Sequence, residues 1–374
     1  MNKHLMKKGV NLIGYARAEF GLGEACRLAA KALESAGIPF CIINFPYSPT
    51  RQNDLSWRHK EVAAPLYNTN VFFINADQMY HHYNKNILKK AWFRNRYNIG
   101  YWHWELPDFP VFWNGSFNLV NEIWVPSQFT YQSISKNTYK PVVIMPHGIL
   151  VEFPANMNRN CFGIPDNRFL FLTMYDIQST SARKNPNGVI DAFKKAFNKN
   201  DGQVGLVLKV NNSNHFPKEL AKLNHKIAEY ENISVIDKIL SRQELNGLMN
   251  VMDCYVSLHR SEGFGLPIAE AMFLGKPVIA TNWSGNVDFI NENNACLVDF
   301  TLEKIERNYG PYHANQKWAE PNIFHAANYM KELVHDRSLV NRIGLNAKKS
   351  IMSDFSPKSI GLKYKSRLTE LGLI

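Results

Sequence analysis

Long apolar runs, paired cysteines and repeats are all scarce in this chain of 374 residues. No apolar run approaches the ~18 residues of a membrane-spanning helix. The apolar stretch at 10–16 meets Arg17 and Glu19 too early for a signal peptide. The five cysteines, at 26, 41, 161, 254 and 296, form no C-x-x-C pair, so we interpret them as reduced, small core residues. These absences exclude a membrane span and a disulfide framework, and they predict a cytoplasmic protein, either soluble or peripheral on the inner face of the plasma membrane.

Acidic residues are outnumbered by basic ones. Forty-three Lys and Arg against 32 Asp and Glu give a net charge of +11, and residues 1–150 contribute +7 of it, from 16 basic and nine acidic side chains. A surplus of this size suits a negatively charged partner: a membrane surface, a lipid-diphosphate-linked glycan or a nucleic acid. Within residues 80–97, basic side chains are interleaved with aromatic ones. This composition suits a membrane interface, but it suits equally an exposed helix whose apolar side is partly buried in the core. The basic residues are Lys85, Lys89, Lys90, Arg94 and Arg96.

One rhythm recurs along the chain: a short β-branched or aromatic run, a loop, then an amphipathic helix. This alternation predicts an α/β fold with parallel sheets. We expect an N-terminal Rossmann-like domain over 1–155, a second one over 156–350, and a C-terminal helix at 351–374 that can pack back on the N-terminal domain. The predicted strands are 10–16, 39–45, 70–75, 97–102, 122–125, 142–145, 169–174, 204–210, 233–236, 253–258, 278–281 and 295–298.

The most informative segment is Ser261–Ala271, S-E-G-F-G-L-P-I-A-E-A, followed by Gly275–Thr281. It reads as a loop, a helix and a strand, with Pro267 in the first helical turn and Gly275 at the helix end. This places Glu270 in the N-terminal turn and Glu262 on the glycine-flanked loop. The two carboxylates can accept hydrogen bonds from sugar hydroxyls, while the glycines let a ligand approach the backbone. The alternative is that Glu270 complements the helix dipole and Glu262 is a solvated loop residue.

This segment resembles the E-x7-E signature of the retaining nucleotide-sugar glycosyltransferases of group 1 (family 4). Three further segments resemble the same family: 168–193 with Arg183-Lys184-Asn185-Pro186, the turn Pro146-His147-Gly148-Ile149, and the strand end Ile99–His103. The resemblance implies the GT-B fold, in which two Rossmann-like domains face each other across a deep cleft and C-terminal helices follow.

The resemblance also implies site residues. Glu270 would bind the nucleotide ribose, Glu262 the transferred sugar, and Lys184 the diphosphate, with Arg183 standing in for an upstream arginine that is absent. His103 is expected to contact the donor sugar, and Glu105 is an acceptor-side candidate. The other donor-binding candidates that the resemblance implies are Gly21, Gly23, Gly263, Phe264, Gly265 and Leu266. Lys209, at the end of a predicted buried strand, is a further candidate for a phosphate contact, although the family often has glycines at this position.

The implied reaction is transfer of a hexose, with retention at the anomeric carbon, to a hydroxyl of a glycan or lipid-linked glycan in bacterial surface polysaccharide synthesis. No metal site and no cofactor are expected. The stretch Tyr101–Pro107 resembles polysaccharide mannosyl- and rhamnosyltransferases and favours GDP-mannose as donor, with dTDP-rhamnose or a UDP-sugar as alternatives.

Other classes of function remain open at this point. An NAD-dependent oxidoreductase would use Gly21-Leu22-Gly23, but its fingerprint requires a third Gly or Ala where Cys26 stands and an acidic residue where Asn44 lies. A nucleic-acid-binding protein would have the charge, yet the sequence has no recognisable zinc-finger, RRM or KH pattern, so we expect no nucleic acid. A non-catalytic sugar-binding protein would keep the same cleft.

Overall fold

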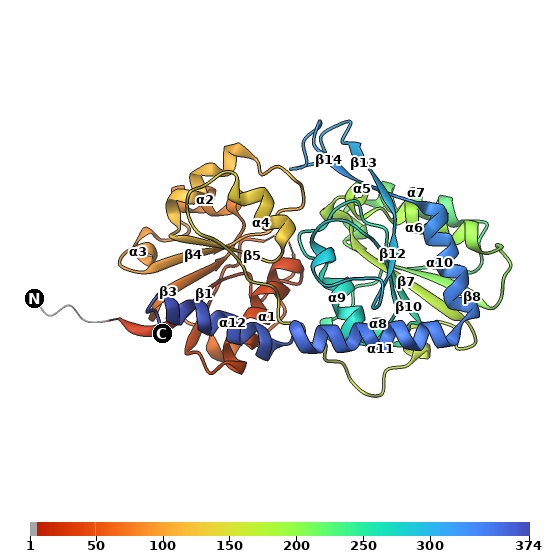
Figure 1. The fold of residues 1–374 in the computed structure, drawn as a ribbon, viewed down its shortest axis with the longest axis horizontal. Helices are drawn as coiled ribbons and strands as arrows, with labels where there is room; N and C mark the ends of the chain where they lie inside the picture. The colour runs from red at the N-terminus through yellow and green to blue at the C-terminus, as the bar shows by residue number, and fades with distance from the viewer. Residues whose placement is uncertain (1–5, 49) are drawn as a thin grey trace, which may run out of the picture. The chain divides into compact units, whose positions relative to one another are not determined.

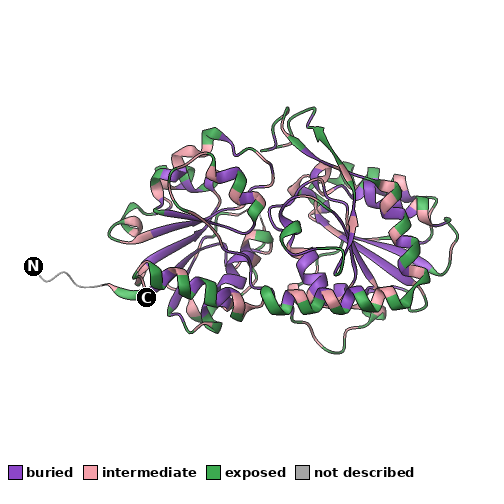
Figure 2. Cartoon of the chain, in the orientation of Figure 1, coloured by how far each residue is buried: buried purple, intermediate pink, exposed green. Residues whose placement is uncertain are grey.

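The computed structural model describes residues 6–48 and 50–374, and these form two compact units (Figure 1). Unit 1 comprises the chain up to Leu150 together with Ser353–Ile374, and unit 2 comprises Val151–Met352. In each unit the strands of the large parallel sheet are mostly buried, and many of the exposed residues lie on the surrounding helices (Figure 2). Among the described residues, no helix is long and apolar enough to cross a membrane.

Unit 1 is built on a parallel six-stranded sheet with the order β2-β1-β3-β4-β5-β6. Its strands are β1 (Lys7–Gly14), β2 (Phe40–Asn44), β3 (Tyr67–Phe73), β4 (Tyr97–Tyr101), β5 (Glu122–Val125) and β6 (Val142–Ile144). Its helices are α1 (Gly21–Ser35), α2 (Ala76–Asn84), α3 (Lys90–Phe93), α4 (Gln128–Ser135) and α12 (Pro357–Glu370), with 3-10 turns at Arg58–Lys60 and Val111–Leu119.

Unit 2 contains a second parallel six-stranded sheet, ordered β12-β11-β10-β7-β8-β9. The strands are β7 (Phe169–Asp176), β8 (Val204–Asn211), β9 (Ile233–Ile236), β10 (Cys254–Ser257), β11 (Val278–Thr281) and β12 (Cys296–Val298). The helices are α5 (Ser181–Lys184), α6 (Pro186–Ala196), α7 (Pro217–Ile227), α8 (Arg242–Val251), α9 (Leu266–Phe273), α10 (Ile323–His335) and α11 (Arg337–Asp354), with 3-10 turns at Arg159–Phe162, Ile177–Ser179, Ser213–His215 and Gly285–Asp288.

Local sequence explains where several helices begin. Ser241 and Glu244 form a capping box at the start of α8, in which each side chain satisfies a backbone N–H of the first turn. Asn185, in the left-handed region at φ 52°, caps α6 by accepting from the Gly188 N–H, and Pro186 follows as the first helical residue. In α1, apolar residues recur at helical spacing and are buried, and the helix ends at Ser35, with Ala36 as its C-cap before Gly37; the buried residues are Ala25, Leu28, Ala29, Ala32 and Leu33.

All twelve strands predicted from the sequence are present in the described residues, and the two Rossmann-like sheets of the GT-B prediction are confirmed. The cleft between them stays a prediction. One element was missed: an antiparallel hairpin of β13 (Phe300–Lys304) and β14 (Lys317–Pro321). The cysteine interpretation was wrong at Cys161, which is exposed in a short 3-10 turn, whereas the other four cysteines are buried.

Candidate active site

The topology of unit 2 brings two loops together. In chain order the sheet has the arrangement 3-2-1-4-5-6, and the direction of strand addition reverses between neighbours β7 and β10. Ligands of open α/β sheets bind outside the carboxyl ends of the strands at such a switch point. The loop after β7 leads to Arg183 and Lys184, and the loop after β10 carries Glu262. The two loops also share a backbone hydrogen bond, from the Arg260 N–H to the Arg183 carbonyl at 2.8 Å.

Glu262 is the centre of this site. It is 8% exposed and accepts a hydrogen bond from Lys184 Nζ at 2.5 Å, while Arg183 Nη1 lies 3.2 Å from its other oxygen. Burial alone would raise the pKa of this carboxyl, but the positive charges of Lys184 and Arg183 outweigh it and hold the pKa at about 2. Glu262 is therefore an ionised hydrogen-bond acceptor at neutral pH and not a solvated loop residue.

Arg183 and Lys184 differ in their surroundings. Arg183 is 4% exposed, and its guanidinium donates to the carbonyls of Ser261 and Ser179 besides facing Glu262. Lys184 keeps a partly exposed side chain that ends on Glu262. Arg183 thus ties the two loops to each other, and Lys184 is the cation of the pair with more freedom to meet a ligand.

The missed hairpin packs on the same loops. Arg260 donates from Nε and Nη2 to the two carboxylate oxygens of Glu320 on β14, at 2.5 and 3.0 Å, and from Nη1 to the Ala182 carbonyl. The Arg260 guanidinium also lies over the Trp318 ring, and that of Arg183 over the Tyr312 ring. The hairpin therefore contacts both site loops. No strand was predicted from the sequence between residues 298 and 322, so this element was missed.

A third loop, after β11, supports the Glu262 backbone. Ser284 Oγ accepts a hydrogen bond from the Glu262 N–H at 2.8 Å, and the Gly285 N–H donates to the Glu262 carbonyl at 2.9 Å. A Cβ at Gly285 would lie 2.2 Å from the Gly263 carbonyl oxygen, so glycine is required there. Ser284 has φ 76° and ψ −148°, a backbone region that residues other than glycine rarely occupy. The loop that supports the Glu262 backbone is therefore strained at this residue. The pair Ser284-Gly285 directly after a predicted strand is the sequence feature that could have indicated this loop.

Glu270 is placed differently from the prediction. Helix α9 begins at Leu266, so Glu270 is its fifth residue, and no acidic residue lies in the first turn. The dipole alternative is therefore wrong for this residue. Glu270 is 3% exposed and forms an ion pair with Arg242 at the start of α8. After burial, its charge and that of Glu262 both contribute to raising the pKa of the Tyr255 hydroxyl, so both carboxylates lie within electrostatic range of that group. Arg242 is a site neighbour that sequence reasoning missed.

The other candidates in unit 2 contribute backbone or buried charge. Gly263 and Gly265 are buried, and Gly265, at φ 97°, turns the chain into α9, which begins at half-buried Leu266. The Phe264 side chain packs inward on Phe289, so only its backbone is suited to a ligand. Lys209 is 1% exposed on β8 and donates to the Val210 carbonyl and to Asn211 Oδ1 at 2.6 Å.

The glycine candidates of unit 1 lie in the first turn of α1 and not in the loop before it. A Cβ at Gly23 would lie 2.0 Å from the Ala18 carbonyl oxygen, so this glycine is needed for the loop to pack against the helix. Gly21 is exposed with open space around it, which leaves it accessible to a ligand. Asn44, which weakened the NAD alternative, accepts a hydrogen bond from the Arg17 N–H and so has a structural role here.

His103 lies directly after β4, where it meets a second histidine. Its Nε2 is 3.0 Å from His147 Nε2, and the two rings are nearly coplanar at 12°. Burial lowers the pKa of His103 to about 4, and burial together with its partner lowers that of His147 well below the usual value. Glu105, half-buried, follows in the same loop. The family turn at 146–149 had been noted in the sequence, but His147 had not been chosen as a site residue.

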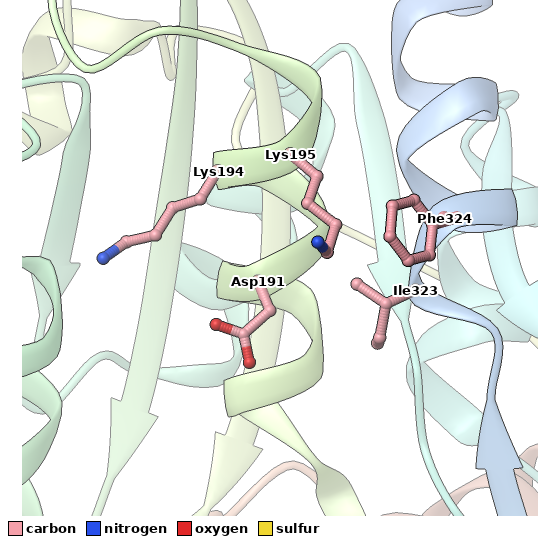
Figure 3. A pocket seen from close by; sticks show the side chains of 5 residues that line it. All are labelled: Asp191, Lys194, Lys195, Ile323 and Phe324. Atoms are coloured by element: carbon pink, nitrogen blue, oxygen red, sulfur yellow. The ribbon is translucent and has the colours of Figure 1, made fainter.

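Two further features contain none of the predicted residues. A hollow of about 570 Å³ lies between α6 and α10 and is lined by Asp191, Lys194, Lys195, Ile323 and Phe324 (Figure 3).

His259, just before the signature, is fully buried, and its ring nitrogens meet Ser257, Trp283 and Asn286, so its role is structural. No group of three His, Cys, Asp or Glu side chains in the described part of the chain is arranged to hold a metal ion.

Comparison with known families identifies the family of this chain. Residues 158–350, which include Arg183, Lys184, Glu262 and Glu270, match the family model described as glycosyl transferases group 1. The chain belongs to the group 1 glycosyl transferases. The match covers the whole switch-point site of unit 2, so glycosyl transfer is the activity of this protein. No curated protein sequence matches this chain.

Several solved structures have a similar fold at low sequence identity. Sucrose-phosphate synthase from Thermosynechococcus elongatus superimposes with a TM-score of 0.70 at 15% identity, over 98% of this chain and 99% of that chain. Anabaena HepE in complex with UDP-glucose gives 0.69 at 15% identity, over 98% of this chain and 100% of that chain. TarM from S. aureus gives 0.58 at 16% identity over 80% of this chain, which spans only 54% of the TarM chain.

Proposed function

We propose that this group 1 glycosyl transferase moves a hexose from a nucleotide-diphosphate sugar to a hydroxyl of a glycan or lipid-linked glycan, with retention at the anomeric carbon. The observation that carries the proposal is the Lys184–Glu262 ion pair at the switch point of unit 2. A cation and an ionised carboxylate side by side match the two chemical features of such a donor, a diphosphate and a hydroxylated sugar. Bacterial surface polysaccharide synthesis is the role that we propose for the product.

Each residue of the pair has a distinct role in this scheme. The donor diphosphate binds Lys184, whose charge stabilises the nucleoside diphosphate as it leaves. Once Lys184 has turned to the phosphate, Glu262 is free to accept hydrogen bonds from the sugar. Arg183 stays 3.2 Å from its other oxygen and continues to lower the pKa of this carboxyl, so Glu262 acts as an acceptor and not as an acid. Glu270, held by Arg242, binds the nucleotide ribose.

The proposed step uses no protein nucleophile. The acceptor hydroxyl oxygen forms a bond to the anomeric carbon on the face from which the diphosphate leaves. The bond from that carbon to the phosphate oxygen breaks, and the acceptor's proton passes to a leaving phosphate oxygen. The protein contributes position and charge, which is where a transferase gains most of its rate. We propose that no metal ion takes part.

The donor base and sugar are ranked by similarity. GDP-mannose stands first because Tyr101–Pro107 resembles the polysaccharide mannosyltransferases. A UDP-sugar stands second, since the HepE structure holds UDP-glucose and the TarM structure holds UDP. dTDP-rhamnose is third.

A thermal-shift panel of GDP, UDP, ADP and dTDP tests this proposal, with NAD as a control ligand and with EDTA or Mg²⁺ in parallel. A ligand that binds only the folded state stabilises it by about 2.7 kcal/mol at 100 times its Kd. We expect one nucleoside diphosphate to raise the Tm in EDTA, and Glu270→Gln to abolish the shift, while Glu219→Gln on the exposed face of α7 keeps it. A shift with NAD alone, or none with any nucleotide, would contradict the proposed donor.

The stereochemistry has its own test. The matching nucleotide sugar is incubated with an acceptor glycan, and the anomeric coupling of the first-formed product is read by proton NMR. Retention gives a product with the donor's own anomeric configuration. An inverted product would remove the proposed same-face step but would leave the transferase assignment intact.

A further inference from the structure

Two histidines of unit 1 form a hydrogen-bonded pair of which the proposed function uses only one member. His103 follows β4 and His147 follows β6, so the sheet brings together residues that lie 44 positions apart. His147 is 2% exposed, and its ring plane lies within 12° of that of His103, with centroids 5.1 Å apart. A contact of 3.0 Å between two ring nitrogens requires one of them to donate and the other to accept.

Tyr101 determines the direction of that hydrogen bond. Its hydroxyl lies 2.5 Å from the Met145 carbonyl, which can only accept, so the single hydroxyl proton is directed there. The same hydroxyl oxygen is 3.3 Å from His147 Nδ1 and must therefore accept from it. His147 then carries its proton on Nδ1. Since burial favours the neutral ring, His147 Nε2 is left as an acceptor.

This series of hydrogen bonds ends at His103. If His147 Nε2 accepts, His103 Nε2 donates, and the neutral His103 ring has a lone pair on Nδ1. That atom is buried and has no hydrogen-bond partner among the described residues. The His103 backbone is fixed, because its N–H donates to Asn75 Oδ1 at 2.9 Å. A buried, fixed acceptor without a donor is costly unless a ligand supplies one.

We infer that His147 is a positioning residue that holds His103 as its Nε2–H tautomer, so that His103 Nδ1 accepts a hydrogen bond from a hydroxyl of the bound substrate. The nature of that hydroxyl, a sugar hydroxyl, rests on the proposed function, whereas the tautomer does not. The relay runs from His103 Nε2–H to His147, from His147 Nδ1–H to Tyr101, and from Tyr101 to the Met145 carbonyl. In this state His103 is an acceptor toward the substrate and donates its one ring proton to His147.

The tautomer is measured directly on the full-length protein labelled with ¹⁵N-histidine, by long-range ¹H–¹⁵N correlation at pH 7.5. His103→Gln and His147→Gln assign the two rings. We expect an Nε2–H pattern for His103 and an Nδ1–H pattern for His147. A doubly protonated His103, or one with its proton on Nδ1, overturns the inference whatever the donor is.

Variants of His147 separate positioning from simple packing. His147→Gln keeps an amide oxygen near the position of Nε2 and should preserve the His103 pattern, whereas His147→Leu keeps volume without an acceptor and should lose it. With the donor that the nucleotide panel selects, we expect His147→Leu to reduce kcat/KM roughly tenfold, the scale of one lost hydrogen bond, and His147→Gln to stay within about threefold of the wild type.

A double variant tests whether His147 acts through His103. His103→Leu/His147→Leu should turn over no more slowly than His103→Leu alone, because the second change removes support from a group that is already absent. Fully additive losses would show an independent role for His147 and overturn the inference. If no nucleotide sugar supports turnover, the proposed function fails, while the NMR measurement still decides the tautomer.

Discussion

At the scale of single residues, the chemistry proposed for unit 2 depends on Lys184 and Glu262. The 2.5 Å contact between them holds the Lys184 ammonium close to the point where the leaving diphosphate is proposed to bind. A cation that is already on the phosphate when the reaction begins needs no reorganisation during it, and losing one such contact typically lowers turnover by about 10²-fold or more.

We therefore expect Lys184→Ala and Glu262→Ala each to lower kcat by at least about 10²-fold in a donor-turnover assay. Lys195→Ala is the matched control, because Lys195 is an exposed lysine of α6 in the hollow of Figure 3. Rates near those of the wild type in a folded Lys184→Ala protein would remove this lysine from the mechanism.

The buried histidine pair predicts a pH dependence of stability. The pKa of His103 is about 4 in the folded protein, below the 6.5 of a free histidine, so the unfolded chain binds more protons between these values. The contribution of neutral His103 to stability is complete above pH 6.5 and is lost as the pH falls toward 4.

We expect the Tm of unit 1 to fall as the pH is lowered from 6.5 to 4, and to fall less in His103→Gln, which has no proton to gain. His225→Gln, on the exposed face of α7, is the control and should follow the wild type. Calorimetric scans at several pH values give the comparison. A steeper decline in His103→Gln would contradict the sign of this shift.

At the scale of elements, the β13–β14 hairpin supports the site loops. Its Glu320 holds Arg260, and Arg260 in turn holds the Ala182 carbonyl, two residues before Lys184. The other strand carries Glu303, which is exposed and lies opposite Trp318 in the ladder. The two glutamates therefore form a matched pair on one hairpin, one in contact with the site loops and one in solvent.

Glu320→Ala should lower kcat/KM for the donor roughly tenfold, since one charge-assisted pair that orients the loop is lost. Glu303→Ala should leave it unchanged. Steady-state kinetics on the two variants, with Tm as the check on folding, measure the difference. Equal behaviour of the two would mean that the hairpin has no part in the geometry of the site.

Four basic side chains in and around α2 and α3 form a surface patch for which the sequence predicts a membrane partner. Lys85, Lys89, Lys90 and Arg94 are exposed, as the membrane proposal requires, whereas Arg96 donates to the carbonyls of Tyr67, Trp92 and Pro65 and belongs to the structure of the loop. We expect charge reversal at Lys89, Lys90 and Arg94 to weaken sedimentation with anionic liposomes, most strongly at low salt. Undiminished binding would exclude this patch as the membrane contact.

At the scale of the whole molecule, the last helix completes the first unit. Figure 1 shows α12 beside α1, and Ile360, Tyr364 and Leu368 lie in the core of unit 1. Arg367 donates to the buried Glu122 of β5, and this contact raises the pKa of the arginine. Unit 1 therefore requires two segments that are separated by all of unit 2.

These helices approach closely at Gly361, since a Cβ there would lie 2.3 Å from the Ala32 carbonyl oxygen. We expect Gly361→Ala to destabilise unit 1 by about 1–3 kcal/mol, the usual cost of overpacking. Leu362→Ala, an exposed neighbour on the same helix, should have little effect. Calorimetry of the full chain would show the lower transition in Gly361→Ala, and an unchanged profile would contradict the close packing.

The sequence by itself determined the local features. Strand runs such as 122–125 and 278–281 and the apolar stripe of α1 follow from side-chain periodicity, which acts over a few residues. The E-x7-E segment also indicated the family, because its glycines and glutamates lie within one loop and helix. These features needed no knowledge of distant contacts.

Only the tertiary structure decided which distant groups meet. Lys184 and Glu262 are 78 positions apart and meet because β7 and β10 are neighbours in the sheet. His147 reaches His103 across the ends of β4 and β6, and α12 returns to α1, although the sequence allowed either domain. The sequence did not predict the β13–β14 hairpin, because the buried residues of this hairpin pack on the site loops and not on a sheet. Each of these outcomes depends on strand order and on packing between segments far apart in the chain, about which local periodicity carries no information.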